Sequence, residues 1–504
     1  MPALMFDDNL QLRERARFFK LSINRYQMEK PIVLIDGKLT EGRSGETLEI
    51  IDPSTGETMG ELIRGQKEDI DAAVKAANKA FEGEWGKLTA LEKGRIIADL
   101  GRLILKNTDQ LTSIESQDVG KPLSQARNDV IACARYCEFY AGSVDKFHGQ
   151  TIPYQNGFTV LTLREPHGVT AHIIPWNYPL QIIGRSVIGS LAAGNTVVIK
   201  PGEDASLSTL FFGKLCLEAG FPRGTVNIVT GYGEEAGAAL ASHPGINHLS
   251  FTGSSRVGTL VQKAAADNTI PVTLELGGKS PQLVFEDADL ERALPFIVNA
   301  AIQNAGQTCS AGSRVLIHNP VYEDLVGFLV RKIDALTVGP ALEDHALGPL
   351  ISQKQLTRVK NLLNQASNLQ ILAKGKLSPN CPKGGFYTLP LLLGNVPPDH
   401  CMAQEEIFGP VLSIIRFNSE EEAVRIANNS KYGLVASVWT KDGARQFRVA
   451  KKLKAGQVFI NNYGAGGGVE LPFGGVKGSG YGREKGMEAL YGFSSLKTIA
   501  INHG

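Results

Sequence analysis

The alternation of short aliphatic runs with helix-like stretches constrains the fold of this chain most strongly. From Thr170 onward, such runs occupy residues 171–174, 196–199, 226–229 and 248–251, and each is followed by a turn. Runs that are aliphatic throughout are expected when both faces of a sheet are covered. The pattern therefore predicts an α/β fold with a parallel sheet and crossover helices, and such sheets bind ligands at the carboxyl ends of their strands.

A second alternation of the same kind begins after Gly277 and Gly278. Its strand-like runs and the helix between them predict a second α/β domain. The runs cover residues 282–285, 314–317, 411–415, 434–439 and 458–461, and the helix covers residues 326–336.

Two outlying segments, residues 158–164 and 496–502, alternate like strands, and they could pair as exposed edges. Exposed edges are usually covered, and association of subunits is one way to cover them. Ahead of both domains, residues 1–66 carry turn signals, and a helical layer is predicted to begin around Ile70 and Val74.

The composition is that of a soluble globular protein. The chain has 504 residues, enough for two or three domains, of which 43% are hydrophobic and 20% charged. Lys+Arg 52 and Asp+Glu 51 leave a formal charge of +1, and no basic run with interleaved aromatic residues occurs. The balance of charge therefore argues against a nucleic-acid partner.

The cysteines and the apolar segments predict a cytoplasmic protein with free thiols. Six cysteines do not make a disulfide framework in a chain of this length, and Cys133 and Cys137 are spaced to share one helix face. No apolar stretch reaches membrane-spanning length, and the mixed charges of residues 7–20 argue against a signal or transit peptide. We expect no membrane partner, and no set of residues is singled out as a metal site.

Cys309 is a candidate nucleophile. It lies in a run of small and polar residues, 307–312, between two apolar segments, which indicates a bend that faces a cavity. Because the thiolate is the attacking species, a local positive dipole or partner that lowers the pKa would activate this residue. The alternative is a conformational cysteine in a loop.

Two glycine-rich turns follow strands of the first sheet. Residues 231–237 lack the spacing of a dinucleotide fingerprint, and an ordinary turn accounts for them. Residues 252–258, which include Gly253 and Ser254, open a helix whose backbone N–H groups could face a pyrophosphate.

Polar side chains stand at the ends of other strands. Lys200 and Glu203 could hold ribose hydroxyls, or they could lie in a solvated turn. Glu275 lies in an otherwise apolar run, so its pKa is expected to rise, which suits a general base; the alternative is an ion pair with Lys279. Asn177 lies on a turn stiffened by two prolines, and its amide can donate to an oxyanion.

Six distant segments resemble, in order and spacing, the signatures of the NAD(P)-dependent aldehyde dehydrogenase superfamily. The resemblance continues through residues 472–477 and 482–484, so it covers nearly the whole chain. The six segments are residues 175–179, 200–203, 251–254, 275–281, 306–309 and 406–410.

The resemblance implies catalytic roles. Cys309 would attack the aldehyde carbonyl, and the Asn177 amide and the Cys309 backbone N–H would hold the oxyanion. A hydride then leaves for the nicotinamide, and Glu275 would activate the water that hydrolyses the resulting thioester. Relatives that pass the acyl group to coenzyme A lack this glutamate, so its presence implies a hydrolytic, non-acylating enzyme.

The resemblance also implies a cofactor site. NAD is favoured because the Glu203 carboxylate, hydrogen-bonded to the ribose 2′-hydroxyl, repels a 2′-phosphate, but dual-specificity relatives keep this glutamate and NADP stays open. The implied contacts are Lys200 and Glu203 at the adenine ribose, Gly253 and Ser254 at the pyrophosphate, Glu406 at the nicotinamide ribose and Phe408 near the ring, with Trp176 and Leu276 beside them.

One departure from the superfamily concerns the helix after Asn177. Broad-specificity members have an aromatic residue and then a lysine where this chain has Arg185 and Ser186. The missing lysine puts in doubt the proton relay from Glu275 through that lysine toward Glu484. Members that act on succinic semialdehyde or on benzaldehyde-type substrates resemble this chain in carrying arginine there, where its planar fork can pair with a carboxylate or stack on a ring.

Arg185 therefore predicts an aldehyde with an anionic, or an aromatic and polar, tail. The alternative is that Arg185 forms a structural ion pair. Tyr178 and Phe473 are expected to supply apolar walls. The glycine run at residues 464–468 suggests a roomy or mobile entrance.

We predict a chain of three parts. Residues 1–147 and 167–277 form a Rossmann-like NAD-binding domain, residues 278–480 form a catalytic α/β domain, and residues 148–166 and 481–504 form a small β oligomerisation element that implies a homodimer or homotetramer.

Two alternatives to hydrolytic aldehyde oxidation are an acyl-transferring enzyme and a non-catalytic, crystallin-like protein. The presence of Cys309, Glu275 and Asn177 together argues against the second, because a storage role would not require all three.

Overall fold

The computed structural model describes residues 30–464 and 468–504. The N-terminal residues 7–20 lie outside the described residues, and so do residues 465–467 of the glycine run. In the part of the chain that is described, no helix has both the length and the apolar character that a membrane crossing needs.

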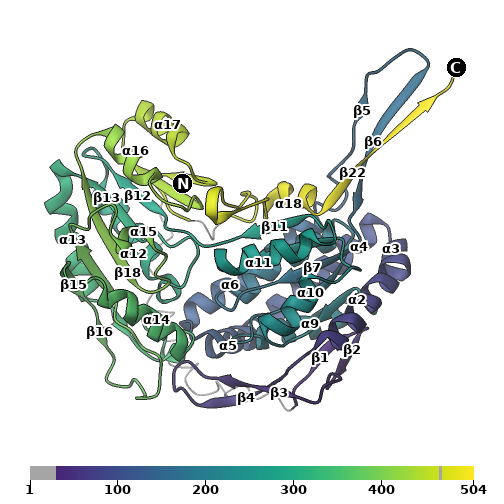
Figure 1. The fold of residues 1–504 in the computed structure, drawn as a ribbon, viewed down its shortest axis with the longest axis horizontal. Helices are drawn as coiled ribbons and strands as arrows, with labels where there is room; N and C mark the ends of the chain where they lie inside the picture. The colour runs from purple at the N-terminus through teal and green to yellow at the C-terminus, as the bar shows by residue number, and fades with distance from the viewer. Residues whose placement is uncertain (1–29, 465–467) are drawn as a thin grey trace.

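An eight-stranded sheet forms the centre of the first α/β unit, in the order β2-β1-β9-β8-β7-β10-β11-β21 (Figure 1). Its five middle strands are parallel, and the four predicted strands are confirmed among them. The parallel strands are β7 (Val169–Ile173), β8 (Thr196–Lys200), β9 (Val226–Ile228), β10 (His248–Thr252) and β11 (Val272–Glu275). The antiparallel edges are β1 (Val33–Ile35), β2 (Lys38–Thr40) and β21 (Gly480–Tyr481).

Helices cover both faces of this sheet, as its aliphatic strands require. One face packs against α2 (Lys67–Glu82), which is the predicted helical layer, and against α11 (Ser255–Ala266). The other face packs against α4 (Ala90–Lys106), α6 (Leu123–Ala141) and α9 (Leu207–Glu218). Thr89 begins α4 with a capping box, in which its backbone N–H donates to Glu92 and its hydroxyl accepts from the Glu92 N–H.

A seven-stranded sheet forms the second α/β unit, in the order β15-β17-β18-β13-β12-β19-β20. All five predicted strands are confirmed, and the predicted helix is α13 (Tyr322–Asp334). The strands are β12 (Pro281–Val284), β13 (Arg314–His318), β15 (Gln370–Lys374), β17 (Leu391–Gly394), β18 (Val411–Phe417), β19 (Val435–Trp439) and β20 (Gln457–Ile460).

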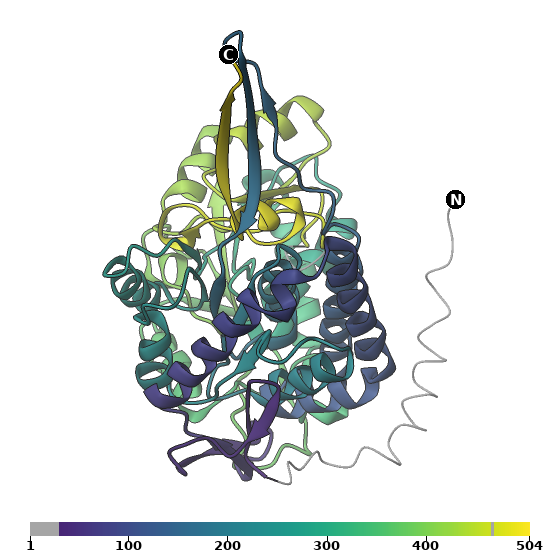
Figure 2. The same ribbon diagram turned by 90° about the vertical axis from the view of Figure 1, so that its right-hand side faces the viewer.

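The two outlying segments form a sheet of their own. β6 (Phe158–Pro166) and β22 (Ser494–Asn502) pair antiparallel along their whole length, and the short β5 (Thr151–Ile152) flanks β6. Figures 1 and 2 show these strands projecting together from the body of the molecule. Exposed apolar side chains, among them Leu163 and Leu496, lie on this projection.

Some features differ from the sequence expectation. Residues 30–66, expected only as turns, hold β1, β2 and the hairpin of β3 (Thr47–Ile51) and β4 (Thr58–Ile63).

The six cysteines are free, as expected, and Cys133 and Cys137 are buried together on α6.

Candidate active site

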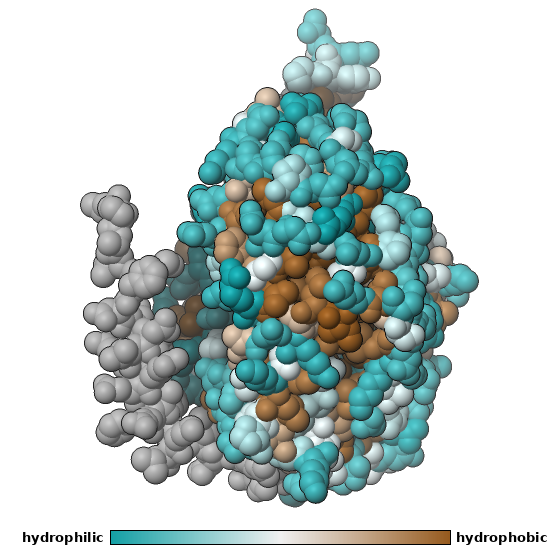
Figure 3. Space-filling model, turned by 90° about the vertical axis from the view of Figure 1, so that its left-hand side faces the viewer, coloured by the Kyte–Doolittle hydropathy of each residue, from teal (hydrophilic) through white to brown (hydrophobic). Residues whose placement is uncertain are grey.

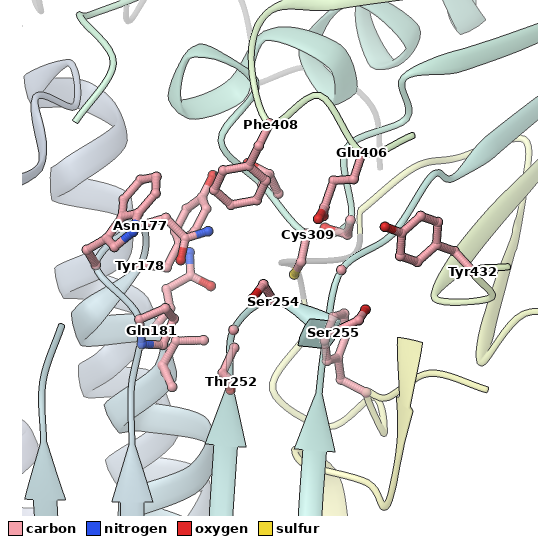
Figure 4. Close-up of a pocket in the computed structure, with 18 of the residues that line it drawn as sticks. Asn177, Tyr178, Gln181, Thr252, Ser254, Ser255, Cys309, Glu406, Phe408 and Tyr432 are labelled. Carbon is pink, nitrogen blue, oxygen red and sulfur yellow. The ribbon is translucent and has the colours of Figure 1, made fainter. Parts of the chain in front are cut away.

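A cavity of about 600 Å³ lies at the carboxyl ends of β7 and β10, where loops of the second unit face the first sheet (Figure 4). This is the edge at which the parallel sheet predicts ligand binding. Ten of the predicted site residues line the cavity, namely Trp176, Asn177, Tyr178, Arg185, Gly253, Ser254, Cys309, Glu406, Phe408 and Phe473.

Cys309 reaches the cavity on a sharply turned loop. The loop follows α12 (Leu290–Ile302), and three successive residues, Asn304, Ala305 and Gly306, have φ of 50°, 52° and 75°. A side chain at Gly306 would come within 2.2 Å of the Gly409 carbonyl oxygen, so only glycine fits there. The predicted bend is confirmed, and the thiol is partly exposed on it.

The loop is held against the turn after β7 by three hydrogen bonds. The Asn177 amide donates to the Gln307 carbonyl at 2.8 Å, and the Asn304 amide donates to the Asn177 carbonyl at 3.0 Å. The hydroxyls of Tyr178 and Thr308 are 2.9 Å apart. Because the Asn177 amide has two N–H groups, one is left to donate to another acceptor near Cys309.

The charges around Cys309 act in opposite directions. Burial raises the pKa of its thiol to about 12; the positive charge of Arg185 lowers this pKa, and the carboxylates of Glu275 and Glu406 raise it. Figure 4 shows the sulfur pointing into the space between Asn177 and Glu406. A nucleophilic thiolate here depends on a base or on further positive charge.

Glu275 is the last residue of β11 and lies behind the cavity wall. Its side chain is 1% exposed, and neither carboxylate oxygen has a hydrogen-bond partner among the described residues. Burial raises the pKa of this carboxyl well above its usual range, with Arg185 opposing the rise. The alternative of an ion pair between Glu275 and Lys279 is wrong, because neither side chain has a polar partner in the described chain.

Arg185 forms a buried ion pair with Glu484. The Arg185 Nε lies 2.6 Å from a Glu484 carboxylate oxygen, and its Nη2 donates to the Thr252 hydroxyl at 3.2 Å. The Ser250 hydroxyl donates to the other Glu484 oxygen at 2.7 Å. The guanidinium carbon also lies 4.7 Å from the centre of the Phe473 ring. The structural ion pair considered for Arg185 is therefore present, although Arg185 also lines the cavity.

Ser186 occupies the position at which this chain lacks the lysine of the broad-specificity relatives. Its hydroxyl donates to the Ile182 carbonyl at 3.0 Å and lies 3.3 Å from a ring nitrogen of His172. These contacts of Ser186 do not join Glu275 to Glu484 in the described part of the chain.

Some of the residues expected to bind the cofactor line the cavity, among them Gly253, Ser254 and Glu406. Gly253 and Ser254 open α11, and the Ser254 hydroxyl caps the helix by accepting from the Val257 N–H at 3.3 Å. Glu406 accepts from the Gly278 N–H at 3.0 Å, and burial raises the pKa of its carboxyl to about 7.

Other predicted cofactor residues lie outside the cavity lining. The Lys200 ammonium lies 2.9 Å from the Glu203 carboxylate beyond the end of β8. The Leu276 side chain is buried against Gly258 in the core. Glu275 and Glu484 also lie behind the lining, connected to it through Arg185.

Several lining residues were not predicted from the sequence, and Gln181, Tyr136 and Lys485 are three of them. Gln181 precedes Arg185 by four residues, a helical spacing that gave a usable signal. Tyr136 comes from α6, and Lys485 comes from the turn before α18 (Gly486–Gly492). Neither has a local sequence signal, because packing of distant segments brings them to the cavity.

Comparisons with known proteins agree on one family. The sequence pattern of the aldehyde dehydrogenase family matches residues 39–499. Hydroxyisobutyraldehyde dehydrogenase of Mycolicibacterium austroafricanum is 42% identical over 474 residues, covering 94% of each chain, and retinal dehydrogenase 2 of Homo sapiens is 40% identical over 476 residues, covering 93% and 91%.

Solved structures similar to this chain belong to the same family. A Burkholderia cenocepacia protein assigned to the aldehyde dehydrogenases superimposes with a TM-score of 0.93 at 58% identity, covering 94% of this chain and 100% of that one. An NAD+ complex of aldehyde dehydrogenase from Bacillus cereus superimposes with a TM-score of 0.91 at 40% identity, covering 94% and 97%. The chain belongs to the aldehyde dehydrogenase family, and with it to the NAD(P)-dependent enzymes that oxidise aldehydes.

Proposed function

We propose that this enzyme oxidises an aldehyde to the free carboxylate through a covalent intermediate on Cys309, with NAD as the hydride acceptor. In the overall reaction, aldehyde, NAD and water give carboxylate, NADH and two protons. The observation that carries the proposal is that the Cys309 thiol shares one cavity with the Asn177 amide, the Gly253–Ser254 turn and Glu406.

Cys309 is the nucleophile in this proposal. Its sulfur attacks the carbonyl carbon, and the Asn177 amide and the Cys309 backbone N–H stabilise the oxyanion that forms. The carbonyl of Gln307 fixes the Asn177 amide next to the sulfur through the 2.8 Å hydrogen bond. Arg185 favours the thiolate electrostatically.

The residues around the cavity fit a dinucleotide. The Ser254 turn offers the N-terminus of α11 to a pyrophosphate, and Lys200 and Glu203, at the carboxyl end of β8, would hold the adenine ribose. Gly277 leaves room for Glu406, since a side chain there would come within 2.4 Å of its carboxylate. When bound, the nicotinamide accepts the hydride that leaves the former aldehyde carbon, so that Cys309 then carries a thioester.

Glu275 is the general base for hydrolysis. A buried carboxyl without hydrogen-bond partners has a raised pKa and takes up a proton readily, which suits the activation of water at the thioester. Glu484 acts in this proposal through its ion pair with Arg185. The positive charge of Arg185 lowers the pKa of both Glu275 and Cys309.

We infer the substrate class from the side chains that line the cavity together with Cys309. Tyr178 and Phe473 provide apolar surface, and Arg185 provides a cation whose planar fork lies against the Phe473 ring. This surface favours an aldehyde with an anionic, or an aromatic and polar, tail.

The projecting sheet is proposed to join subunits of a cytoplasmic homodimer or homotetramer. The strands of this sheet leave an exposed edge. Apolar side chains also gather on a second surface, the face of the second α/β unit, as Figure 3 shows. In this proposal, residues 148–166 and 481–504 form the joining element, and the domain division at residues 277 and 278 separates cofactor binding from catalysis.

The experiment measures the oxidation of a panel of aldehydes through the absorbance of the NADH that forms. Short aliphatic, amino, carboxylated and aromatic aldehydes are tested with NAD and NADP in parallel, with and without coenzyme A, and the product is identified. NADH and a free acid support the proposal. A coenzyme A thioester as product contradicts hydrolysis, and a lack of NADH with every aldehyde contradicts the oxidation itself.

A further inference from the structure

Gln181 is an uncharged polar residue in the lining of the cavity, and the proposed roles leave it unused. It belongs to the short helix α7 (Pro179–Ile182), which continues directly into the π-helical turn Ile183–Ile188. Figure 4 shows Gln181 on the same side of the cavity as Tyr178, with Glu406 on the other side. A single π-helical turn is uncommon in proteins and frequently lies at a functional site.

The two polar neighbours of Gln181 on this helical face already have partners inside the protein. Residues three and four apart lie on the same face of a helix, which places Tyr178 and Arg185 on either side of Gln181. The Tyr178 hydroxyl lies 2.9 Å from the Thr308 hydroxyl. Arg185 is paired with Glu484 at 2.6 Å. These two side chains therefore hold their positions through contacts within the protein.

The Asp129 carboxylate fixes the orientation of the Gln181 amide. The amide nitrogen Nε2 donates to one Asp129 oxygen at 2.6 Å, and the Lys121 ammonium donates to the other oxygen. A carboxylate paired with an ammonium group only accepts hydrogen bonds, so the nitrogen of the amide must face it and not the oxygen. Asp129 is 2% exposed and Lys121 is fully buried. The amide is thus oriented from the core before any substrate binds.

This orientation leaves the Gln181 carbonyl oxygen as a hydrogen-bond acceptor. Among the described residues, no hydrogen bond reaches this oxygen, and the side chain is half-buried in the cavity lining. A carbonyl oxygen carries a partial negative charge and accepts from hydroxyl or N–H donors, whereas it repels a carboxylate. An acceptor left without a donor in a closed site costs free energy, so the site discriminates in favour of a ligand that supplies the donor.

We propose that the Gln181 carbonyl oxygen accepts a hydrogen bond from a hydroxyl group on the substrate, and that the enzyme prefers aromatic aldehydes with a ring hydroxyl. The inference rests on the proposed oxidation at Cys309 and narrows its substrate class. Tyr178 and Phe473 supply apolar surface for the aromatic ring, and Gln181 fixes the rotation of that ring relative to the sulfur. Gln181 is then a specificity-determining residue, and Asp129 is a positioning residue that acts through it.

The test compares substituted benzaldehydes in the full-length protein with NAD. The kcat/KM is measured for the three hydroxybenzaldehyde isomers and for the three fluorobenzaldehydes, because fluorine is similar in size to a hydroxyl but donates no hydrogen bond. Each hydroxy-to-fluoro ratio is compared between the wild type and Gln181→Met, so that the intrinsic reactivity of each aldehyde cancels. We expect the ratio of at least one isomer to fall about 3- to 10-fold in the variant, as for the loss of one neutral hydrogen bond.

The outcomes separate the inference from the proposed oxidation. A fall in the ratio of one isomer supports the inference and identifies the ring position of the hydroxyl. Unchanged ratios for all three isomers overturn it, including the case in which the variant slows hydroxy and fluoro aldehydes equally. Wild-type turnover of benzaldehyde tests the oxidation at Cys309 separately, since that reaction needs no hydroxyl on the ring.

Gln303→Met is the matched control. Gln303 lines the same cavity, but no hydrogen bond holds its side-chain amide within the described part of the chain. The hydroxy-to-fluoro ratios of this variant should equal those of the wild type. A loss of the preference in Gln303→Met, with none in Gln181→Met, contradicts the proposal.

Asp129→Asn tests the positioning role. An asparagine side chain both donates and accepts, so it no longer requires the amide nitrogen of Gln181 to face it. The ratio of the isomer identified with Gln181→Met should fall, while kcat/KM for benzaldehyde changes less. An unchanged ratio contradicts the positioning role of Asp129.

A measurement on the wild type alone covers the case in which a variant does not fold. Hydroxybenzamides and fluorobenzamides, which have no aldehyde group to oxidise, are tested as competitive inhibitors against benzaldehyde. One hydroxybenzamide isomer should bind about 3- to 10-fold more tightly than the fluorobenzamide with the same substitution. Equal inhibition within all three pairs overturns the proposal.

Discussion

The two ends of the cavity are built by different means. At the end proposed for the cofactor, called the cofactor end, turns after parallel strands present backbone N–H groups and short polar side chains, as in the Gly253–Ser254 turn that begins α11. At the end proposed for the substrate, called the substrate end, long charged side chains are buried beside an aromatic ring, as in the Arg185–Glu484 pair next to Phe473. The first arrangement depends on local geometry and the second on compensation between distant charges, so the two ends should respond differently to substitution.

Cys309→Ala should have the largest effect, because it removes the only nucleophile proposed between the two ends. We expect dehydrogenase activity to fall by at least about 10⁴-fold, measured as NADH formation. NAD binding, measured by calorimetry, should change little, because the cofactor end is intact. Cys381→Ala is the control, and retention of activity in Cys309→Ala would contradict the assignment.

Glu275→Gln should slow turnover about 10³-fold by removing the base for hydrolysis. The first NADH should still form as a burst, since the hydride step precedes hydrolysis. In the wild type the raised pKa of Glu275 means that the deacylation rate rises with pH until this carboxyl has lost its proton. The variant should lack that rise with pH. Steady-state turnover at the wild-type rate in the variant would contradict the role of Glu275 as the base.

Arg185→Leu should destabilise the fold by about 3 kcal/mol, because it leaves Glu484 buried with its charge uncompensated. Thermal and denaturant unfolding measure this change. The double variant Arg185→Leu with Glu484→Gln should recover much of the loss, as expected for a buried pair. An equal loss in the double variant would mean that the two charges do not depend on each other.

Glu203→Gln should have the smallest effect and should concern only the cofactor end. We expect the ratio of kcat/KM for NADP to that for NAD to rise about 10-fold, because a negative charge near the ribose 2′ position is removed. Glu218→Gln, an exposed glutamate at the end of α9, is the control. An unchanged ratio would place Glu203 away from the adenine ribose.

The same contrast explains what could be predicted from the sequence. Strands that are aliphatic on both faces predicted both sheets, and the rule that ligands bind at strand carboxyl ends placed Asn177 and Gly253 at one edge. Cys309 was found because a run of small residues indicates a bend. Each of these signals lies within a few residues of the group it identifies.

The substrate end could not be predicted in this way. The partner of Arg185 comes from the opposite end of the chain, and the carboxylate that orients the Gln181 amide comes from a distant helix. Strand β17 was missed because its four residues are too few to show a period. Glu275 and Lys279 are close in sequence, but no ion pair joins them in the described chain. Contacts made only in the folded chain leave no local pattern.

The most direct test of the central claim is the mass of the covalent intermediate. Glu275→Gln is incubated with NAD and an aldehyde, quenched in acid, digested and analysed by mass spectrometry. The account predicts that the peptide containing Cys309 gains the mass of the acyl group, and only when NAD is present. An acyl group on a different cysteine, or an unmodified Cys309 peptide after a full burst of NADH, would contradict it.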